Sequence, residues 1–316
     1  MEIMTLFPPR WGRRRGIETL VCILACATSA QIPTKAGHPP ESSAFPDDSS
    51  VRSSLAPIES ELRRELEADP ESAPILFRLG QVLQQENKPK ESLEIYTRAA
   101  RLQKPDAEQL RSVAMDYVLL KLYDDAIHWL QIAQSFDPRN ANVLYDLGRC
   151  FYTQDRFHEA EEMYLQVLQI QPKSVKAEEN LGLTLDMESQ PEKAEAALRT
   201  AASWAVQQSS DEWPFLNLGV FLLDHRRAGE AVMFLEKATS IAPRNAACHE
   251  KLGRALTESG KTSDGMRELE TAVQLDPKNP KIHFELGRAY RDAGQRDKAR
   301  GEFALSQTLY GEHSQD

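Results

Sequence analysis

The sequence predicts an all-α chain in which a pair of antiparallel helices is repeated about seven times and stacked into a solenoid. The first observation behind this fold class is a recurring aliphatic residue followed by Gly or Ala, with five spacings of 34 residues and one of 37. The second is a series of bulky residues in phase with it, such as Tyr96, Tyr164 and Leu235. Such a repeat cannot bury its apolar face alone, so its core has to continue into the neighbouring repeats. The aliphatic–small pairs are Leu79-Gly80, Val113-Ala114, Leu147-Gly148, Leu181-Gly182, Leu218-Gly219, Leu252-Gly253 and Leu286-Gly287.

The first element along the chain is a targeting segment over residues 1–30. Arg10 and the Arg13–Arg15 cluster precede the short apolar run LVCILACATSA, an arrangement typical of a secretory signal. The small residues at its end favour cleavage after Ala30. Other interpretations stay open: cleavage within Ala25-Cys26-Ala27, a bacterial lipoprotein signal that places lipid on Cys26, and an uncut anchor. We therefore expect an exported protein of the periplasm or cell envelope, with membrane contact only through this segment or its lipid.

Residues 31–54 are predicted to be a disordered linker, because Pro and Ser dominate them and little apolar surface is available to offset the entropy of ordering. The following residues 55–69 predict an N-terminal capping helix. Leu55, Ile58, Leu62 and Leu66 recur there at helical spacing before Asp69-Pro70.

Seven repeats follow over residues 73–313. Most of them end near a proline, which disfavours helical backbone at the preceding residue. The fourth lacks that proline and contains three extra residues, which predicts a longer second helix or a local bend in the solenoid. No eighth first helix follows the last repeat, so its end is a candidate homodimer contact, with a frayed last helix as the alternative. The repeats are 73–106, 107–140, 141–174, 175–211, 212–245, 246–279 and 280–313.

This pattern resembles the tetratricopeptide repeat (TPR) family over residues 73 to about 310. The resemblance implies a right-handed superhelical solenoid whose concave face, lined by the first helix of each repeat, binds an extended peptide or a partner helix. The alternative for the residues at these positions is packing between repeats. Some members grip a carboxylate with Lys and Asn at set positions, which this chain does not reproduce, and a family Asn ladder is present only at Asn180 and Asn217. The candidate groove residues are Met115, Tyr145, Arg149, Tyr152, Leu183, Trp213, Leu216, Val220, Arg254 and Arg288.

Several kinds of chemistry are disfavoured. A net charge of −10 repels nucleic acid phosphates. Gly260-Lys261-Thr262 lacks the strand and the upstream glycine of a phosphate-binding loop. His249 and His283 occupy equivalent positions 34 residues apart, and packing histidines are favoured over a metal pair because no further ligand is in register. We therefore predict no enzyme activity, catalytic residue, metal or cofactor.

Cys150 and Cys248 lie three repeats apart, beyond the reach of a disulfide, and are predicted to be buried and unpaired. The function predicted from the sequence is a protein–protein interaction scaffold in the cell envelope. Two alternatives remain: an accessory subunit of an envelope or glycan-assembly enzyme, and a self-associating structural protein.

Overall fold

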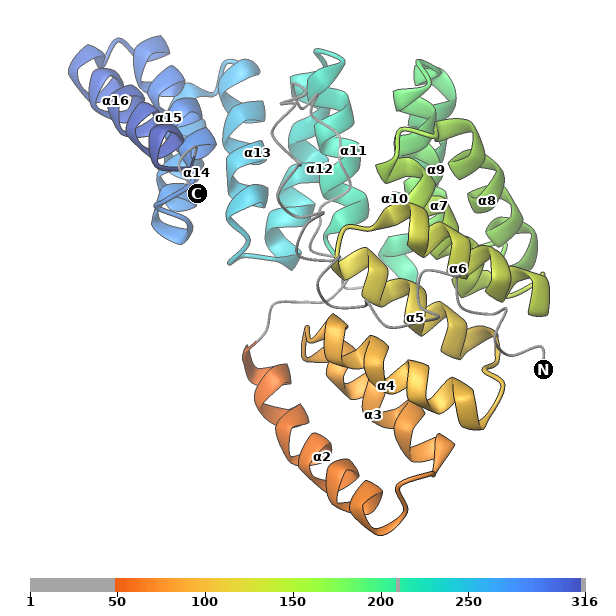
Figure 1. Cartoon of the computed structure of the whole chain (residues 1–316). Helices are drawn as coiled ribbons and strands as arrows, with labels where there is room; N and C mark the ends of the chain where they lie inside the picture. The colour runs from red at the N-terminus through yellow and green to blue at the C-terminus, as the bar shows by residue number, and fades with distance from the viewer. Residues whose placement is uncertain (1–48, 209–210, 314–316) are drawn as a thin grey trace. The chain divides into compact units, whose positions relative to one another are not determined.

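A computed structural model describes residues 49–208 and 211–313 of the chain (Figure 1). The predicted signal over residues 1–30, including Cys26, lies outside the described residues. The same holds for the predicted linker up to residue 48.

The described residues form fifteen helices and no strand, which confirms the all-α prediction. They divide into two compact units, here called the N-terminal half, ending at Ile170, and the C-terminal half, beginning at Gln171. The N-terminal half contains α2 (Ser49–Ala68), α3 (Ala73–Gln85), α4 (Pro89–Leu102), α5 (Ala107–Leu119), α6 (Tyr123–Phe136), α7 (Ala141–Thr153) and α8 (Phe157–Ile170). The C-terminal half contains α9 (Val175–Met187), α10 (Pro191–Gln208), α11 (Trp213–Asp224), α12 (Ala228–Ile241), α13 (Ala246–Glu258), α14 (Thr262–Leu275), α15 (Pro280–Asp292) and α16 (Arg296–His313).

Each predicted repeat consists of two packed helices, for example α3 with α4 in the N-terminal half and α13 with α14 in the C-terminal half. The second helix of a repeat then packs on the first helix of the next, as α4 does on α5 and α12 on α13. The stacked helix pairs predicted from the sequence are thus present in both halves (Figure 1).

The first helix of every repeat stops at a residue in the left-handed backbone region. In the sixth repeat this residue is Gly260, at φ 90°, as expected for a helix stop, whereas the third repeat uses Asp155 at φ 57°. The amide of the next residue closes the helix end, as Arg156 does by donating to the carbonyl of Phe151 at 2.9 Å. The equivalent residues of the other repeats are Asn87, Lys121, Ser189, Arg226 and Gly294.

The small residue of each aliphatic–small pair lies where the two helices of a repeat cross. A Cβ atom added to Gly148 would lie 2.7 Å from Cε1 of Tyr164, and one added to Gly219 would lie 2.5 Å from Leu235. The bulky partner therefore occupies the volume that a larger side chain would need. This contact is why the small and bulky series recur in phase.

The N-terminal capping helix is longer than predicted. α2 begins at Ser49, so residues 49–54, predicted as linker, are helical. No proline or glycine lies between Pro46 and Pro57 to interrupt the helix. The helix buries Leu55 and Leu62 against Leu79 and Leu83 of α3.

The fourth repeat contains the longer second helix that its three extra residues predict. α10 has 18 residues, against 14 in α8 and 14 in α12. Cys150 and Cys248 are both buried and unpaired, as expected.

Candidate functional site

The first helices of neighbouring repeats contact one another directly and so form an inner layer within each half. In the N-terminal half α3 contacts α5, and α5 contacts α7. In the C-terminal half the contacts run from α9 to α11, α13 and α15. All ten candidate groove residues lie on these inner helices.

The candidate groove residues differ in exposure. Met115, Tyr152 and Leu216 are buried, with exposed fractions of 8%, 2% and 3%, so these three side chains contribute to packing. The other seven are half-buried and retain accessible surface; they are Tyr145, Arg149, Leu183, Trp213, Val220, Arg254 and Arg288. A role in binding a partner stays a prediction for them.

In the N-terminal half the inner layer contains a buried carboxylate, Asp146 on α7. Its Oδ2 accepts a hydrogen bond from Nε of Arg111 on α5 at 2.5 Å, and Nη1 of Arg149 lies 3.9 Å from its Oδ1. Burial raises the pKa of Asp146, and the two guanidinium groups oppose that effect. Arg149, a candidate groove residue, therefore already has a carboxylate of its own chain beside it.

In the C-terminal half charged residues form a ladder along α11, α13 and α15. Nη1 of Arg254 lies 3.5 Å from Oδ1 of Asp224, and its Nε is 2.9 Å from Oε1 of Glu258. Arg288 continues the ladder, at 3.8 Å from the same Glu258 oxygen and 3.0 Å from Oε2 of Glu285. Both arginines that we expected to face a partner are thus paired within the chain. The i, i+4 spacing of Arg254 and Glu258 was the sequence signal for this arrangement.

A second buried carboxyl group of the N-terminal half, Asp116 on α5, lies against α3 and α4. Ser92 Oγ is 2.6 Å from Asp116 Oδ2 and 2.8 Å from the carbonyl oxygen of Gly80, while Oδ1 of Asp116 has no partner among the described residues. A hydroxyl carries one proton, so if Ser92 donates to Gly80, the carboxyl group must donate to Ser92. Burial raises the pKa of Asp116 to about 7, which favours this protonated form.

The inner layer of the C-terminal half contains a buried carboxyl group on α9 that sequence reasoning missed. Glu179 on α9 is 6% exposed, and its Oε1 accepts a hydrogen bond from Nδ2 of Asn217 on α11 at 2.6 Å. Asn217 is thus engaged within the chain, and Asn180 donates to the carbonyl of Lys176 at 2.8 Å. Glu179 occupies the same position of its repeat as the candidate groove residue Tyr145, and this equivalence was the signal that would have drawn attention to it.

His249 and His283 do not bond to each other but make two copies of the same local arrangement. Nδ1 of His249 is 2.7 Å from Glu268, and its Nε2 is 3.0 Å from the carbonyl oxygen of Pro243. His283 repeats these distances with Glu302 and the carbonyl oxygen of Pro277. These contacts agree with the prediction of packing histidines, and each ring joins the two helices of its own repeat to the preceding loop.

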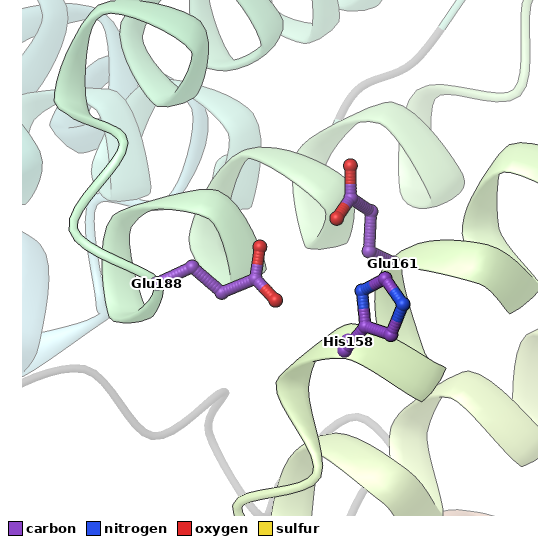
Figure 2. Close-up of side chains that lie close together, drawn as sticks. All are labelled: His158, Glu161 and Glu188. Atoms are coloured by element: carbon purple, nitrogen blue, oxygen red, sulfur yellow. The ribbon is translucent and has the colours of Figure 1, made fainter.

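Figure 2 shows His158 and Glu161, which project from α8, together with Glu188, which follows α9. His158 is exposed, and its Nε2 lies 3.6 Å from Oε1 of Glu162 on the same helix. Glu188 belongs to the other half of the chain, and exposed acidic groups are common without a bound ion. We assign no metal site to these residues.

No helix among the described residues combines the length and the apolar character that crossing a membrane requires.

Models of known repeat families match three segments of the chain. Models described as "Tetratricopeptide repeat" match residues 73–106 and 114–175, and one described as "TPR repeat" matches residues 253–294. These segments coincide with the first, the second to third and the sixth to seventh predicted repeats. A search of curated proteins found no match.

Three solved structures share the fold. The Cut9 and Hcn1 hetero-tetramer of the APC/C contains a chain similar at a TM-score of 0.61 and 15% identity, over 82% of this chain and 51% of that one, so this chain spans about half of its length. A tetratricopeptide repeat protein from Parabacteroides merdae is similar at a TM-score of 0.61 and 16% identity, over 75% of this chain and 93% of that one. PilW, a type IV pilus biogenesis factor, has a TM-score of 0.59 and 17% identity, over 65% and 94%.

Proposed function

Because this chain belongs to the tetratricopeptide repeat family, we propose that it is a non-catalytic scaffold that binds a peptide or a helix of a partner protein on its inner helices. Repeats of this kind generally serve as interaction modules. The proposal includes the location predicted from the sequence: export through the N-terminal segment and function in the cell envelope.

One observation carries the binding role. Leu183 on α9 and Trp213 and Val220 on α11 are half-buried apolar residues on two inner helices that contact each other in the C-terminal half. Apolar and aromatic side chains that keep accessible surface next to a packed core are typical anchors of protein interfaces. The same layer offers few unpaired charges, because Arg254 and Arg288 are engaged in the ladder. The apolar anchors are therefore the part of this face available to a partner.

The binding role is tested by affinity capture with the full chain as bait, followed by crosslinking and mass spectrometry. A variant carrying Leu183→Glu and Val220→Glu changes two half-buried anchors and leaves the buried Leu216 intact. The matched control is Met233→Glu on α12, which is 63% exposed and lies on a second helix. We expect crosslinks to α9 and α11 that disappear in the double variant and persist in the control. Capture that is equal for all three baits would contradict the proposed surface.

The location is tested by fractionation and intact-mass measurement of the natural protein. Export with cleavage after Ala30 gives a chain that begins at Gln31, whereas a lipoprotein begins at an acylated Cys26. A full-length chain found with the cytosolic proteins would contradict export.

Self-association remains a second candidate because of the last repeat. Phe284, Leu305 and Tyr310 on α15 and α16 are exposed by 47%, 42% and 49%. If copies pair through these residues, sedimentation velocity will show a dimer whose fraction rises with concentration and falls in a Leu305→Glu variant. A monomer throughout the concentration series would exclude this candidate.

A further inference from the structure

The last two repeats share a pair of residues that differs from the pair in the other repeats. In the first helix of each, a histidine lies 19 residues before a glutamate of the second helix, as His249 does before Glu268. In both cases the histidine is accompanied by the glutamate. Four of the other five repeats have two apolar residues at these positions: Leu76 with Ile95, Leu110 with Trp129, Leu144 with Met163, and Phe215 with Phe234.

Each of these histidine rings lies between two hydrogen-bond acceptors. Nδ1 of His249 is 2.7 Å from Oε2 of Glu268 on α14, and its Nε2 is 3.0 Å from the carbonyl oxygen of Pro243 in the preceding loop. His283 repeats both distances, to a glutamate of α16 and to the loop before α15. We call the two arrangements histidine clamps: His249 with Glu268 and the carbonyl of Pro243, and His283 with Glu302 and the carbonyl of Pro277.

A clamp that makes both contacts holds one proton more than a neutral ring and an ionised carboxylate carry together. A neutral imidazole has a single N–H group, whereas a carbonyl and a carboxylate only accept. The ring is therefore an imidazolium that donates to both oxygens, beside a carboxylate that balances its charge. Without that proton one ring nitrogen and its oxygen are both acceptors. His249 and His283 are buried, with exposed fractions of 8% and 2%, and unsatisfied buried acceptors are costly.

We propose that the two histidine clamps form a pH-sensitive device, which joins the two helices of each of the last two repeats as long as each clamp retains its proton. When the proton passes to solvent at higher pH, the neutral ring keeps the N–H on Nε2 and its bond to the loop carbonyl. The glutamate then loses its donor and turns to water, since the side chains of Glu268 and Glu302 are 30% and 24% exposed. The inference goes beyond the scaffold function, because it concerns these repeats whether or not a partner is bound.

The charged groups near His249 leave Glu268 as the group that holds its proton. Among the described residues no other side chain forms a hydrogen bond or an ion pair with this ring. Glu212, before α11, accepts a hydrogen bond from Asn245 at the start of α13. Arg244 follows the accepting proline, but it is exposed and can direct its charge to water.

The surroundings of His283 are similar. Glu302 is the one side chain among the described residues that bonds to this ring, and it also acts electrostatically on Tyr290 of α15. Asp276 and Lys278 flank the accepting proline, and Lys278 is exposed. In both clamps, therefore, a carboxylate of the second helix is the partner that retains the proton.

The retained proton is tested by nuclear magnetic resonance of the ring nitrogens in the ¹⁵N-labelled full chain. A histidine peptide in the same buffer is the reference, and since a free imidazole titrates near pH 6.5, about nine-tenths of it is neutral at pH 7.5. We expect His249 and His283 to keep two protonated ring nitrogens at that pH. Their signals are assigned by their loss in His249→Gln and His283→Gln variants. Two rings that are as neutral as the reference peptide would overturn the proposal.

The effect on the helices is measured by amide hydrogen exchange in α13 to α16. The comparison is a variant that carries the apolar pair of the third repeat in both clamps: His249→Leu with Glu268→Met, and His283→Leu with Glu302→Met. Away from the substitutions both proteins have the same intrinsic exchange rate at a given pH, so the ratio of their rates reports opening. We expect the natural chain to lose protection relative to the variant above about pH 6.5, by at most about tenfold per pH unit and clamp, because opening releases a proton. A ratio that stays constant from pH 6 to pH 9 would contradict the device.

A conservative variant separates the proton from the shape of the clamp. In Glu268→Gln with Glu302→Gln, each amide group donates to Nδ1 of a neutral ring while Nε2–H still donates to the loop carbonyl. Both contacts then form without the extra proton, so protection should no longer fall relative to the apolar variant as the pH rises. Glu236→Gln, at an exposed glutamate of α12, is the matched control and should keep the natural pH dependence. If the double glutamine variant keeps it as well, the glutamates do not hold the proton and the proposal fails.

Discussion

Asp146 in the N-terminal half and Glu179 in the C-terminal half are both buried carboxyl groups on inner helices, at adjacent positions of the repeat. Asp146 is held by a guanidinium at 2.5 Å, with a second one nearby. Glu179 has one neutral amide donor at 2.6 Å and lines a pocket. The carboxyl group of Asp146 is thus balanced by arginine, whereas burial without a basic hydrogen-bond partner raises the pKa of Glu179 to about 8.

The difference shows that a buried carboxyl group behaves differently depending on whether a cation lies beside it. A buried charge that is paired within the chain fixes the packing of two repeats. It offers little to a partner, because an opposite charge of the same chain already balances it. A buried carboxyl group without a basic partner lacks this balance, so burial raises its pKa and it retains its proton to a higher pH. Three predictions test this distinction, in order of decreasing effect.

The largest effect is expected where the pair is buried. Arg111→Met removes the closest cation from Asp146 and should lower the free energy of unfolding by about 3–5 kcal/mol, because the carboxylate is left uncompensated in the core. Chemical denaturation at pH 7 measures it. The matched double variant Arg111→Met with Asp146→Leu removes both charges and should recover most of the loss. If the double variant is as unstable as the single one, the arginine contributes by shape rather than by charge.

The pH dependence of Asp116 should be next in size. Its pKa rises from 3.8 to about 7 on folding, so above about pH 4 the unfolded chain releases a proton that the folded chain retains. Its contribution to stability is therefore lost as the pH rises from about 4 to about 7, by about 4 kcal/mol at most.

Asp116→Asn keeps a donor to Ser92 and cannot ionise, so its advantage over the natural chain should grow from pH 4 to pH 7 and then remain constant. Urea unfolding of both proteins at pH 4, 5.5, 7 and 8 measures the difference. A constant difference at every pH would show that Asp116 does not carry the retained proton.

The smallest effect is expected in the partly exposed ladder. Arg254 is 24% exposed, and its pairs with Asp224 and Glu258 are accessible to water. Arg254→Ala should lower the free energy of unfolding by less than about 1 kcal/mol, because exposed ion pairs contribute little. The loss should shrink further as salt is raised. If Arg254→Ala lowers the free energy of unfolding as much as Arg111→Met does, burial does not explain the difference between these two ion pairs.

Local patterns in the sequence determined most of the fold. The 34-residue step, the small residues that meet Tyr164 and Leu235, and the longer α10 all follow from spacing and side-chain size. These features were predictable because helices and their crossings depend on residues three, four or about sixteen positions apart. The start of α2 at Ser49 was harder to predict, because the mostly polar residues 49–54 are compatible with either a linker or a helix.

The partners of the polar residues were decided only by the tertiary structure. The sequence places Arg149, Arg254 and Arg288 on the inner helices, but it does not show that each faces a carboxylate of its own chain. Nor does it show that Asp146 meets Arg111 or that Glu179 meets Asn217, 35 and 38 residues away. Such contacts depend on how neighbouring repeats are rotated and which side-chain conformations fit between them. That geometry arises from the packing of the whole stack, and it leaves Asp146 balanced by arginines and Glu179 facing a pocket.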